Sequence, residues 1–217
     1  MIVILLIFLL VFYFFYTRKK NVYTLKNVLS KSECEKFISM AKKIEFLTTP
    51  DPVDNEPVYQ IEILDPDKSV NHPELYFKCL ELYKRHLPKQ KGDLNYIFLK
   101  RYAPGERTNI PMHVDLSKST INILLSNPND YKGGEFYLFE DPKDSRVKQV
   151  HSVSTIKKQH EMLKNMEDLP VVYMKQGDMI NYQGRIYDHG VLHASRNLWC
   201  SCQTHRWIPA SGTLFRK

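Results

Sequence analysis

The sequence predicts a mainly β domain of the α+β class: a double-sheet jelly roll supported by N-terminal helices and preceded by a transmembrane anchor. Three observations lead to this prediction. An uninterrupted apolar run opens the chain, two amphipathic helical patterns follow it, and about eight short β-rich segments fill the remainder. With 217 residues, of which 43% are hydrophobic, the chain is long enough for one such domain and an appendage.

The first sixteen residues, MIVILLIFLLVFYFFY, are all apolar or aromatic, and the basic cluster Arg18, Lys19 and Lys20 follows at once. A helix of that length covers about 24 Å, and a basic flank can extend it toward the ~30 Å thickness of a hydrocarbon core. A cleavable signal peptide would begin with basic residues and end at small ones, and neither feature is present. We therefore expect residues 1–20 to be a single membrane anchor. The positive-inside rule would leave the domain of residues 21–217 in the cytosol.

Two amphipathic helices are expected to support the sheets. Ser30 and Glu33 form a capping box at the start of the first helix, and apolar residues follow it at i, i+3, i+4 and i+7 spacing. Pro73 can open the second helix. Its buried stripe is predicted to consist of Tyr76, Cys79, Leu80, Tyr83 and Leu87.

The strands are predicted from β-branched and aromatic runs with turn residues between them. They cover residues 58–63, 96–102, the segment around His113, 120–125, 135–139, 171–174, 178–182, 187–193 and 198–208. A charged insertion at about residues 140–169 interrupts them, and a helix near 156–166 is expected within it. An insertion of this kind is either a lid or substrate loop or a decoration of the domain.

The motif His113-Val114-Asp115 carries the chemistry that the sequence indicates. Residues two apart in an extended strand point to the same face, so His113 and Asp115 can present a nitrogen and an oxygen to one ion. A second histidine from farther along the chain would complete a two-histidine, one-carboxylate triad. Such a triad leaves coordination positions open and suits non-haem Fe(II).

The composition limits the possible classes of binding partner only in part. The formal charge of +7 favours acidic partners in general, namely nucleic acid, anionic lipid or acidic proteins. No cluster of aromatic and basic residues of the kind that reads bases is visible, so nucleic acid is not the expected partner. Four cysteines in a chain of this length do not make a disulfide scaffold, and the pattern leaves the oligomeric state open.

Five ordered elements between about residues 27 and 208 resemble the prolyl-4-hydroxylase type of 2-oxoglutarate/Fe(II) dioxygenase. They are the helix start VLSKSECEKFISMAKK, the run from Arg101-Tyr102 through Gly105 to His113-x-Asp115, the segment TINILLS with Gly133-Gly134-Glu135, the segment KQGD ending at Asp178, and Tyr187-Asp188-His189-Gly190. The resemblance implies a double-stranded β-helix with His113, Asp115 and His189 as Fe(II) ligands. It also implies 2-oxoglutarate and O2 as cosubstrates and ascorbate as reductant. His193, four residues after His189, competes for the place of the third ligand.

One departure from the family concerns the cosubstrate. The family places a lysine or arginine about ten residues after the distal histidine to bind the far carboxylate of 2-oxoglutarate, whereas Trp199 occupies that place here. Arg206 is the preferred substitute because it lies on the last predicted strand, on the same face as the small residues Cys200, Cys202 and Thr204, and an arginine can bind a carboxylate bidentately. Arg196, in a predicted turn, is the alternative. Tyr102 would add a hydroxyl donor, as the family's tyrosine does.

The resemblance implies hydroxylation of a protein side chain, with peptidyl proline first and peptidyl lysine second. A nucleic-acid demethylase of the same chemistry is a further alternative. A non-catalytic, membrane-tethered binding module is a different class, and Trp199 favours it. Membrane-anchored hydroxylases that the chain resembles face the lumen of the endoplasmic reticulum, which conflicts with the cytosolic orientation given by the flanking charges.

Overall fold

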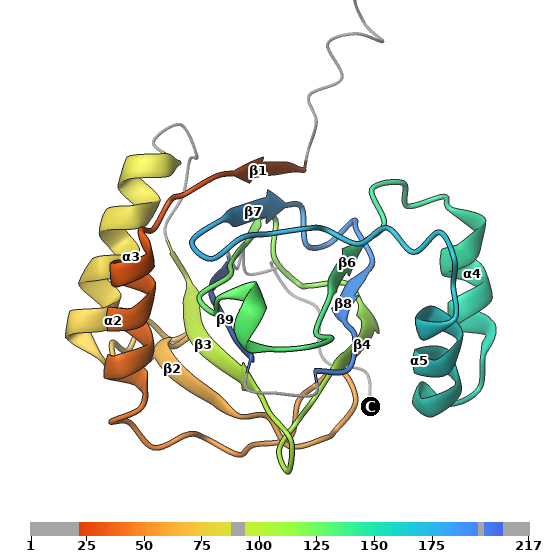
Figure 1. The fold of residues 1–217 in the computed structure, drawn as a ribbon, viewed down its shortest axis with the longest axis horizontal. Coiled ribbons are helices and arrows are strands. Elements are labelled where there is room, and N and C mark those ends of the chain that lie inside the picture. The colour runs from red at the N-terminus through yellow and green to blue at the C-terminus, as the bar shows by residue number, and fades with distance from the viewer. Residues whose placement is uncertain (1–21, 88–93, 195–197, 206–217) are drawn as a thin grey trace, which may run out of the picture.

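The computed structural model describes residues 22–87, 94–194 and 198–205, and within these ranges it is a mainly β domain with helices on two sides (Figure 1). The helices are α2 (Lys31–Ala41), α3 (Pro73–His86), α4 (Ser145–Ser152), α5 (Ile156–Lys164) and the 3-10 turn η1 (Pro128–Asp130). The strands are β1 (Tyr23–Leu25), β2 (Gln60–Leu64), β3 (Tyr96–Tyr102), β4 (Ile110–His113), β5 (Thr120–Ile123), β6 (Phe136–Leu138), β7 (Met179–Tyr182), β8 (His189–Val191) and β9 (Leu198–His205).

The strands pair antiparallel in three sheets of three, with the orders β1-β7-β5, β2-β3-β9 and β4-β8-β6. Strand β5 lies beside β9, so the first two sheets together form one wall of the domain. The sheet β4-β8-β6 forms the opposite wall (Figure 1). Two opposed antiparallel walls confirm the predicted jelly-roll architecture.

The three hydrophobic clusters correspond to the layers of the domain. The first fills the space between helices α2 and α3 and the outer face of the larger wall, where Ile61, Ile97 and Ile121 lie buried. The second lies between the two walls. The third packs α4 and α5 against the outer face of the smaller wall through Val150 and Leu163. Alternate residues of each strand therefore face either a helix layer or the space between the walls.

Helix α2 begins where the capping box predicts. Ser30 is its N-cap: its side chain accepts from the Glu33 amide, and Glu33 accepts from the Ser30 amide at 2.7 Å. Helix α3 begins at Pro73 as predicted, and the predicted buried stripe is correct only in part, at Cys79 and at Leu87 just after the helix. Leu75, Cys79 and Leu82 are the buried residues, while Tyr76, Leu80 and Tyr83 are only partly buried and pack at the edge of the first cluster. The real stripe still has helical spacing, rotated by one residue.

Two further expectations differ from the structure. Residues 171–174 form a single bridge between Val171 and Tyr137 in place of a strand. Leu138 donates to the Pro170 carbonyl and Val172 donates to the Phe136 carbonyl, but Pro170 has no N–H with which to continue the ladder. The insertion contains α4 in addition to the helix predicted near 156–166. Across the described ranges, none of the helices combines the length and apolar character that a membrane span requires. The predicted anchor, residues 1–20, lies outside the described residues.

Candidate metal centre

Two histidines and an aspartate meet where β4 and β8 lie side by side. His113 is the last residue of β4, His189 is the first residue of β8, and the strand register pairs them directly. Asp115 follows the end of β4, and its backbone N–H donates to the Gly184 carbonyl at 2.9 Å. One ligand atom from each of these three side chains lies within 4.8 Å of the other two. The group is therefore compact enough to surround one metal ion.

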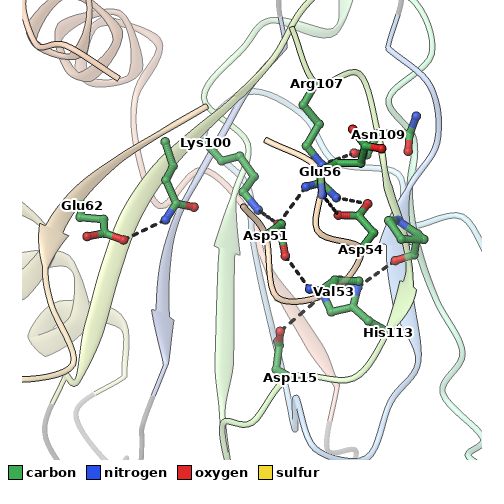
Figure 2. A network of polar contacts seen from close by, with 12 residues as sticks. Asp51, Val53, Asp54, Glu56, Glu62, Lys100, Arg107, Asn109, His113 and Asp115 are labelled. Atoms are coloured by element: carbon green, nitrogen blue, oxygen red, sulfur yellow. Dashed lines mark hydrogen bonds and ion pairs between the residues drawn. The ribbon is translucent and has the colours of Figure 1, made fainter. Parts of the chain in front are cut away.

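Both imidazole rings are oriented by hydrogen bonds to backbone carbonyls. His113 Nδ1 lies 2.8 Å from the carbonyl oxygen of Pro111, and His189 Nδ1 lies 2.9 Å from that of Tyr187. A neutral imidazole that donates from Nδ1 keeps a lone pair on Nε2. The two Nε2 atoms lie 3.6 Å and 3.5 Å from the two oxygens of Asp115 (Figure 2 shows the His113 contact).

The donor set fits a divalent metal ion. His189 Nε2 is buried and has no hydrogen-bond partner, although buried ring nitrogens normally have one. Its lone pair faces a carboxylate oxygen, which is an arrangement that a cation between the two atoms would satisfy. Nδ1–H bonds to backbone carbonyls are also the usual second contacts of metal-binding histidines. Two nitrogens and one carboxylate suit non-haem Fe(II).

A chain of hydroxyl groups holds the Asp115 carboxylate. Thr120 Oγ1 donates to Asp115 Oδ2 at 2.5 Å, and Ser117 Oγ lies 2.5 Å from the same threonine hydroxyl. Tyr182 Oη lies 3.5 Å from Asp115 Oδ2 and accepts from the side-chain amide of Asn122 at 3.1 Å. These buried groups fix the direction in which the carboxylate points.

The charges at the centre are linked. Burial lowers the pKa of His113, and the neighbouring His189 lowers it further. Burial acts in the same direction on His189, but the contact with Asp115 outweighs it and raises the pKa of His189. Asp115 thus favours the protonated form of His189 over that of His113, and a bound divalent cation would compete with that proton.

The centre opens into a cavity of about 990 Å³ between the two walls, to which all three of its side chains contribute. This volume lies in the range of small-molecule sites. Buried side chains such as Tyr102, Leu124 and Phe136 form part of its lining. Val114, Leu116 and Tyr173 also line the cavity, yet they are exposed to solvent, so they mark its mouth with apolar surface.

Four charged side chains form a buried cluster beside this cavity (Figure 2). Asp51 Oδ2 lies 3.2 Å from Lys100 Nζ and 3.1 Å from an Arg107 guanidinium nitrogen, and Arg107 also reaches Asp54 at 2.6 Å. Burial alone would raise the pKa of Asp51, but Lys100, the Val53 amide and Arg107 together lower it. Through these ion pairs, the loop that carries Asp51 and Asp54 contacts Lys100 of β3 and Arg107, which precedes β4.

A polar contact links the insertion to the segment that carries His189. His151 of α4 lies with Nε2 2.8 Å from Asp188 Oδ1, and Asp188 directly precedes His189. His151 also lines the cavity. The remainder of the insertion packs on the outer face of the smaller wall, so it supports the strands that carry the histidines.

The other predicted site residues differ in their position relative to the metal centre. Tyr102 is buried and lines the cavity, as expected for a residue that contacts a cosubstrate. His193 is exposed and does not belong to the compact group of ligand atoms. Trp199 lies in β9 opposite Arg101 of β3. Arg196 and Arg206, the two predicted carboxylate-binding residues, lie outside the described residues.

Two glycines at the centre, Gly190 and Gly184, have structural roles that the sequence analysis did not assign. A Cβ atom on Gly190 would lie 2.3 Å from the Tyr137 hydroxyl and 2.7 Å from the carbonyl of Ile110, because β8 runs between β4 and β6 there. A Cβ atom on Gly184 would lie 2.5 Å from the Asp115 Cβ and from the Thr120 hydroxyl. The His-Gly pair at 189 gave a sequence signal for Gly190. Gly184 lies in a loop and belongs to no recognisable motif, so it carries no signal in the sequence.

No protein-family model and no curated protein sequence matches the chain, but solved structures do. A prolyl-4-hydroxylase from Pseudomonas putida superposes with a TM-score of 0.53 at 13% identity, covering 87% of this chain and 93% of that one. A prolyl hydroxylase from Trichoplax adhaerens, in complex with a peptide fragment of the hypoxia inducible factor oxygen degradation domain, gives 0.55 at 10% identity over 86% and 84%. HygX from Streptomyces hygroscopicus, with nickel and 2-oxoglutarate bound, gives 0.52 at 14% identity over 94% and 88%.

These likenesses show that the chain has the fold of the 2-oxoglutarate/Fe(II) oxygenases, prolyl-4-hydroxylases among them. This is the fold that the sequence resemblance implies. At such low identity the likeness concerns the fold, and the chemistry has to be argued from the side chains of this chain.

Proposed function

We propose that the chain is a 2-oxoglutarate- and O2-dependent Fe(II) dioxygenase that hydroxylates a protein side chain, with peptidyl proline as the first candidate. One observation carries the proposal: two imidazole Nε2 atoms and one carboxylate converge at a cavity, and one of these nitrogens is buried without a partner. Three protein ligands leave positions open for small molecules, which is the arrangement that metal-assisted oxidation requires.

Each group in the site has a role in this proposal. His113, Asp115 and His189 would hold the iron, and Thr120 would keep the carboxylate of Asp115 in the orientation that binding requires. Bound Fe(II) would supply the oxidising chemistry, with 2-oxoglutarate and O2 consumed and succinate and CO2 released. The walls of the cavity would exclude bulk water from the reacting groups, and the buried Tyr102 would donate its hydroxyl to the cosubstrate.

The mouth of the cavity favours a peptide side chain over a nucleobase. The exposed lining residues include Val114, Leu116 and Tyr173, which are apolar or aromatic, and none of the exposed lining residues that the structure describes is a lysine or arginine. A nucleic-acid substrate would require basic residues for its phosphates. An apolar rim suits the ring of a proline or the aliphatic part of a lysine. The Trichoplax neighbour, which was crystallised with a peptide, adds support by analogy.

The test uses the full chain, purified in detergent and handled without oxygen until the assay starts. We expect Fe(II)-dependent conversion of 2-oxoglutarate to succinate, stimulated by a pool of proline-rich peptides more than by lysine-rich peptides or a methylated oligonucleotide. The His113→Ala and Asp115→Ala variants should abolish this conversion. Undiminished turnover in either variant would contradict the assignment of the ligands. Iron binding without turnover would instead support the non-catalytic module that Trp199 suggests.

We also propose that residues 1–20 tether the domain to a membrane, because the apolar run and its basic flank have the composition of an anchor. The flanking charges place the domain in the cytosol, whereas the resemblance to anchored hydroxylases places it in the lumen of the endoplasmic reticulum. Protease treatment of sealed microsomes that carry the full chain decides between the two. A protected domain indicates the lumen, a digested one indicates the cytosol, and release of the chain by alkaline carbonate would contradict the anchor.

A further inference from the structure

We propose that Lys100, a residue of β3, binds the far carboxylate of the cosubstrate. The inference rests on the proposed function and assigns one of its binding groups. A dicarboxylate such as 2-oxoglutarate needs a cation in its pocket, because a buried, uncompensated carboxylate is costly. Among the described residues that line the cavity, Lys100 is the only lysine or arginine. The lining also contains Asp51, Glu62, Asp115 and Glu135, so an anion has few other places of favourable potential.

The position of Lys100 suits this role. It lies on β3 between Phe98 and Tyr102, and all three of these residues line the cavity, as alternation along a strand requires. Its side chain is 8% exposed, and its Nζ lies 5.4 Å from the centre of the Phe98 ring. The ammonium is thus held at the wall of the cavity and away from bulk water, where its attraction for a carboxylate is stronger than at the surface.

The contact between Lys100 and Asp51 is compatible with ligand binding. Asp51 has two other partners: the Arg107 guanidinium forms an ion pair with it at 3.1 Å, and the Val53 amide donates a hydrogen bond to it at 3.0 Å. Arg107 does not line the cavity and cannot serve a ligand there directly. An ammonium carries three N–H donors, so Lys100 can contact Asp51 and a ligand carboxylate together. Arg107 would compensate Asp51 if Lys100 turned fully toward the ligand (Figure 2).

The strand register adds a second, independent observation. β3 and β9 are neighbours, with Arg101 opposite Trp199 and Lys100 opposite Cys200. Lys100 therefore lies at the same level of the wall as the part of β9 that follows His189 by about ten residues. A cation on β3 at this level therefore lies beside the stretch of β9 where the family places its carboxylate-binding residue.

The experiment measures binding and requires no turnover. The full chain, loaded with Fe(II) and kept free of oxygen, is titrated calorimetrically with 2-oxoglutarate and with 2-oxopentanoate, which has the same carbon chain without the far carboxylate. We compare wild type with Lys100→Met, and Lys36→Met, an exposed lysine of α2, serves as the matched control. We expect Lys100→Met to lower the affinity for 2-oxoglutarate by about 10- to 100-fold, as for a lost charged hydrogen bond. Its affinity for 2-oxopentanoate should not change.

Two outcomes would overturn the assignment. An equal loss for both 2-oxo acids would mean that Lys100 only supports the structure. An unchanged affinity for 2-oxoglutarate, together with a loss in Arg206→Met, would move the carboxylate site to Arg206. If Lys100→Met folds poorly because Asp51 has lost a partner, the double variant Lys100→Met/Asp51→Asn removes both charges and must show the same selective loss. Wild-type protein that binds neither 2-oxo acid would refute the proposed function itself.

Discussion

Thr120 Oγ1 lies 2.5 Å from Asp115 Oδ2, so the first residue of β5 fixes the carboxylate that faces both histidines. The threonine hydroxyl lies in turn 2.5 Å from Ser117 Oγ, and both side chains are completely buried. Outer groups of this kind orient metal ligands, and their loss typically lowers metal affinity by about 10- to 100-fold. The carboxylate is thus positioned from the larger wall, whereas the two histidines come from the smaller one.

Replacing Thr120 by valine keeps the shape of the side chain and removes the hydroxyl. We expect Thr120→Val to lower the affinity for Fe(II) by about 10- to 100-fold, because Asp115 loses the donor that orients it. Calorimetric titration of the full chain with Fe(II) under anaerobic conditions measures this change. Thr120→Ser, which restores a hydroxyl, should recover most of the affinity. If serine were no better than valine, packing rather than the hydrogen bond would be responsible.

The choice between His189 and His193 yields a second prediction. His189 is buried and faces Asp115 at 3.5 Å, whereas His193 is exposed and lies outside the compact group. His189→Ala should abolish Fe(II) binding, and the matched variant His193→Ala should leave it unchanged. Metal titration and succinate formation are measured for both variants. A metal site that survived His189→Ala and disappeared in His193→Ala would exchange the roles of the two residues.

The features that follow from local rules could be predicted from the sequence. The capping box at Ser30 and Glu33 and the proline at residue 73 each give the start of a helix, because their effect depends only on neighbours in the chain. The H-x-D spacing brings His113 and Asp115 together for the same reason. The resemblance then pointed to His189, whose place beside His113 depends on the pairing of β4 with β8.

The remainder depends on contacts between distant segments, which one sequence does not show. In the sequence, Lys100 has the pattern of an ordinary strand residue. Only the structure shows that it lines the cavity and that Asp51 lies 3.2 Å from it. Gly184 gives no local signal, because the atoms it must avoid belong to residues more than sixty positions earlier, such as Asp115 and Thr120. Part of the predicted α3 stripe was misjudged because tyrosines at the edge of the core have the same helical spacing as the residues inside it.

Metal binding should depend on pH through His189. The contact with Asp115 raises the pKa of His189 above its ordinary value, so the imidazole keeps its proton to a higher pH than an isolated histidine would. A metal ion has to displace that proton. Affinity for Fe(II) should therefore rise with pH until His189 is deprotonated and then level off. Calorimetry in buffers of different ionisation enthalpy should record proton release on binding, and a pH-independent affinity without proton release would contradict this coupling.

Gly184 provides a steric test of the same centre. In Gly184→Ala the new methyl group would lie 2.5 Å from the Asp115 Cβ and from the Thr120 hydroxyl, so one of these groups must move. We expect metal affinity to fall at least about tenfold, as when a supporting contact is lost. Gly105→Ala is the control: its Cβ meets nothing within 4 Å, but its φ of +79° is unfavourable for alanine. That variant should lose stability by about 1 kcal/mol and keep its metal affinity. Equal metal affinities in the two variants would refute the steric argument.

Asp178 links the start of the domain to β7, and its loss should destabilise the fold. Its carboxylate accepts hydrogen bonds from the backbone amides of Asn27 and Lys175 at 3.0 Å and 2.8 Å and from Lys26 Nζ at 3.0 Å. Asp178→Ala leaves two amide donors without their acceptor, so the free energy of unfolding should fall by about 2–4 kcal/mol in urea denaturation. Lys26→Met should cost much less, since Lys26 is 58% exposed and its charge is screened by solvent.

The pH dependence of the stability that Asp178 contributes shows whether its negative charge or only its packing stabilises the fold. Burial alone would raise the pKa of Asp178, but the two amides and Lys26 outweigh it, and the folded-state pKa is lowered. A carboxylate with a lowered pKa stabilises the fold fully above its unfolded-state pKa of about 3.9 and loses this effect as the pH falls through its folded-state pKa. The difference in unfolding free energy between wild type and Asp178→Ala should therefore shrink in acid. A difference that stayed constant from neutral pH down to acid unfolding would mean that the negative charge of Asp178 contributes nothing.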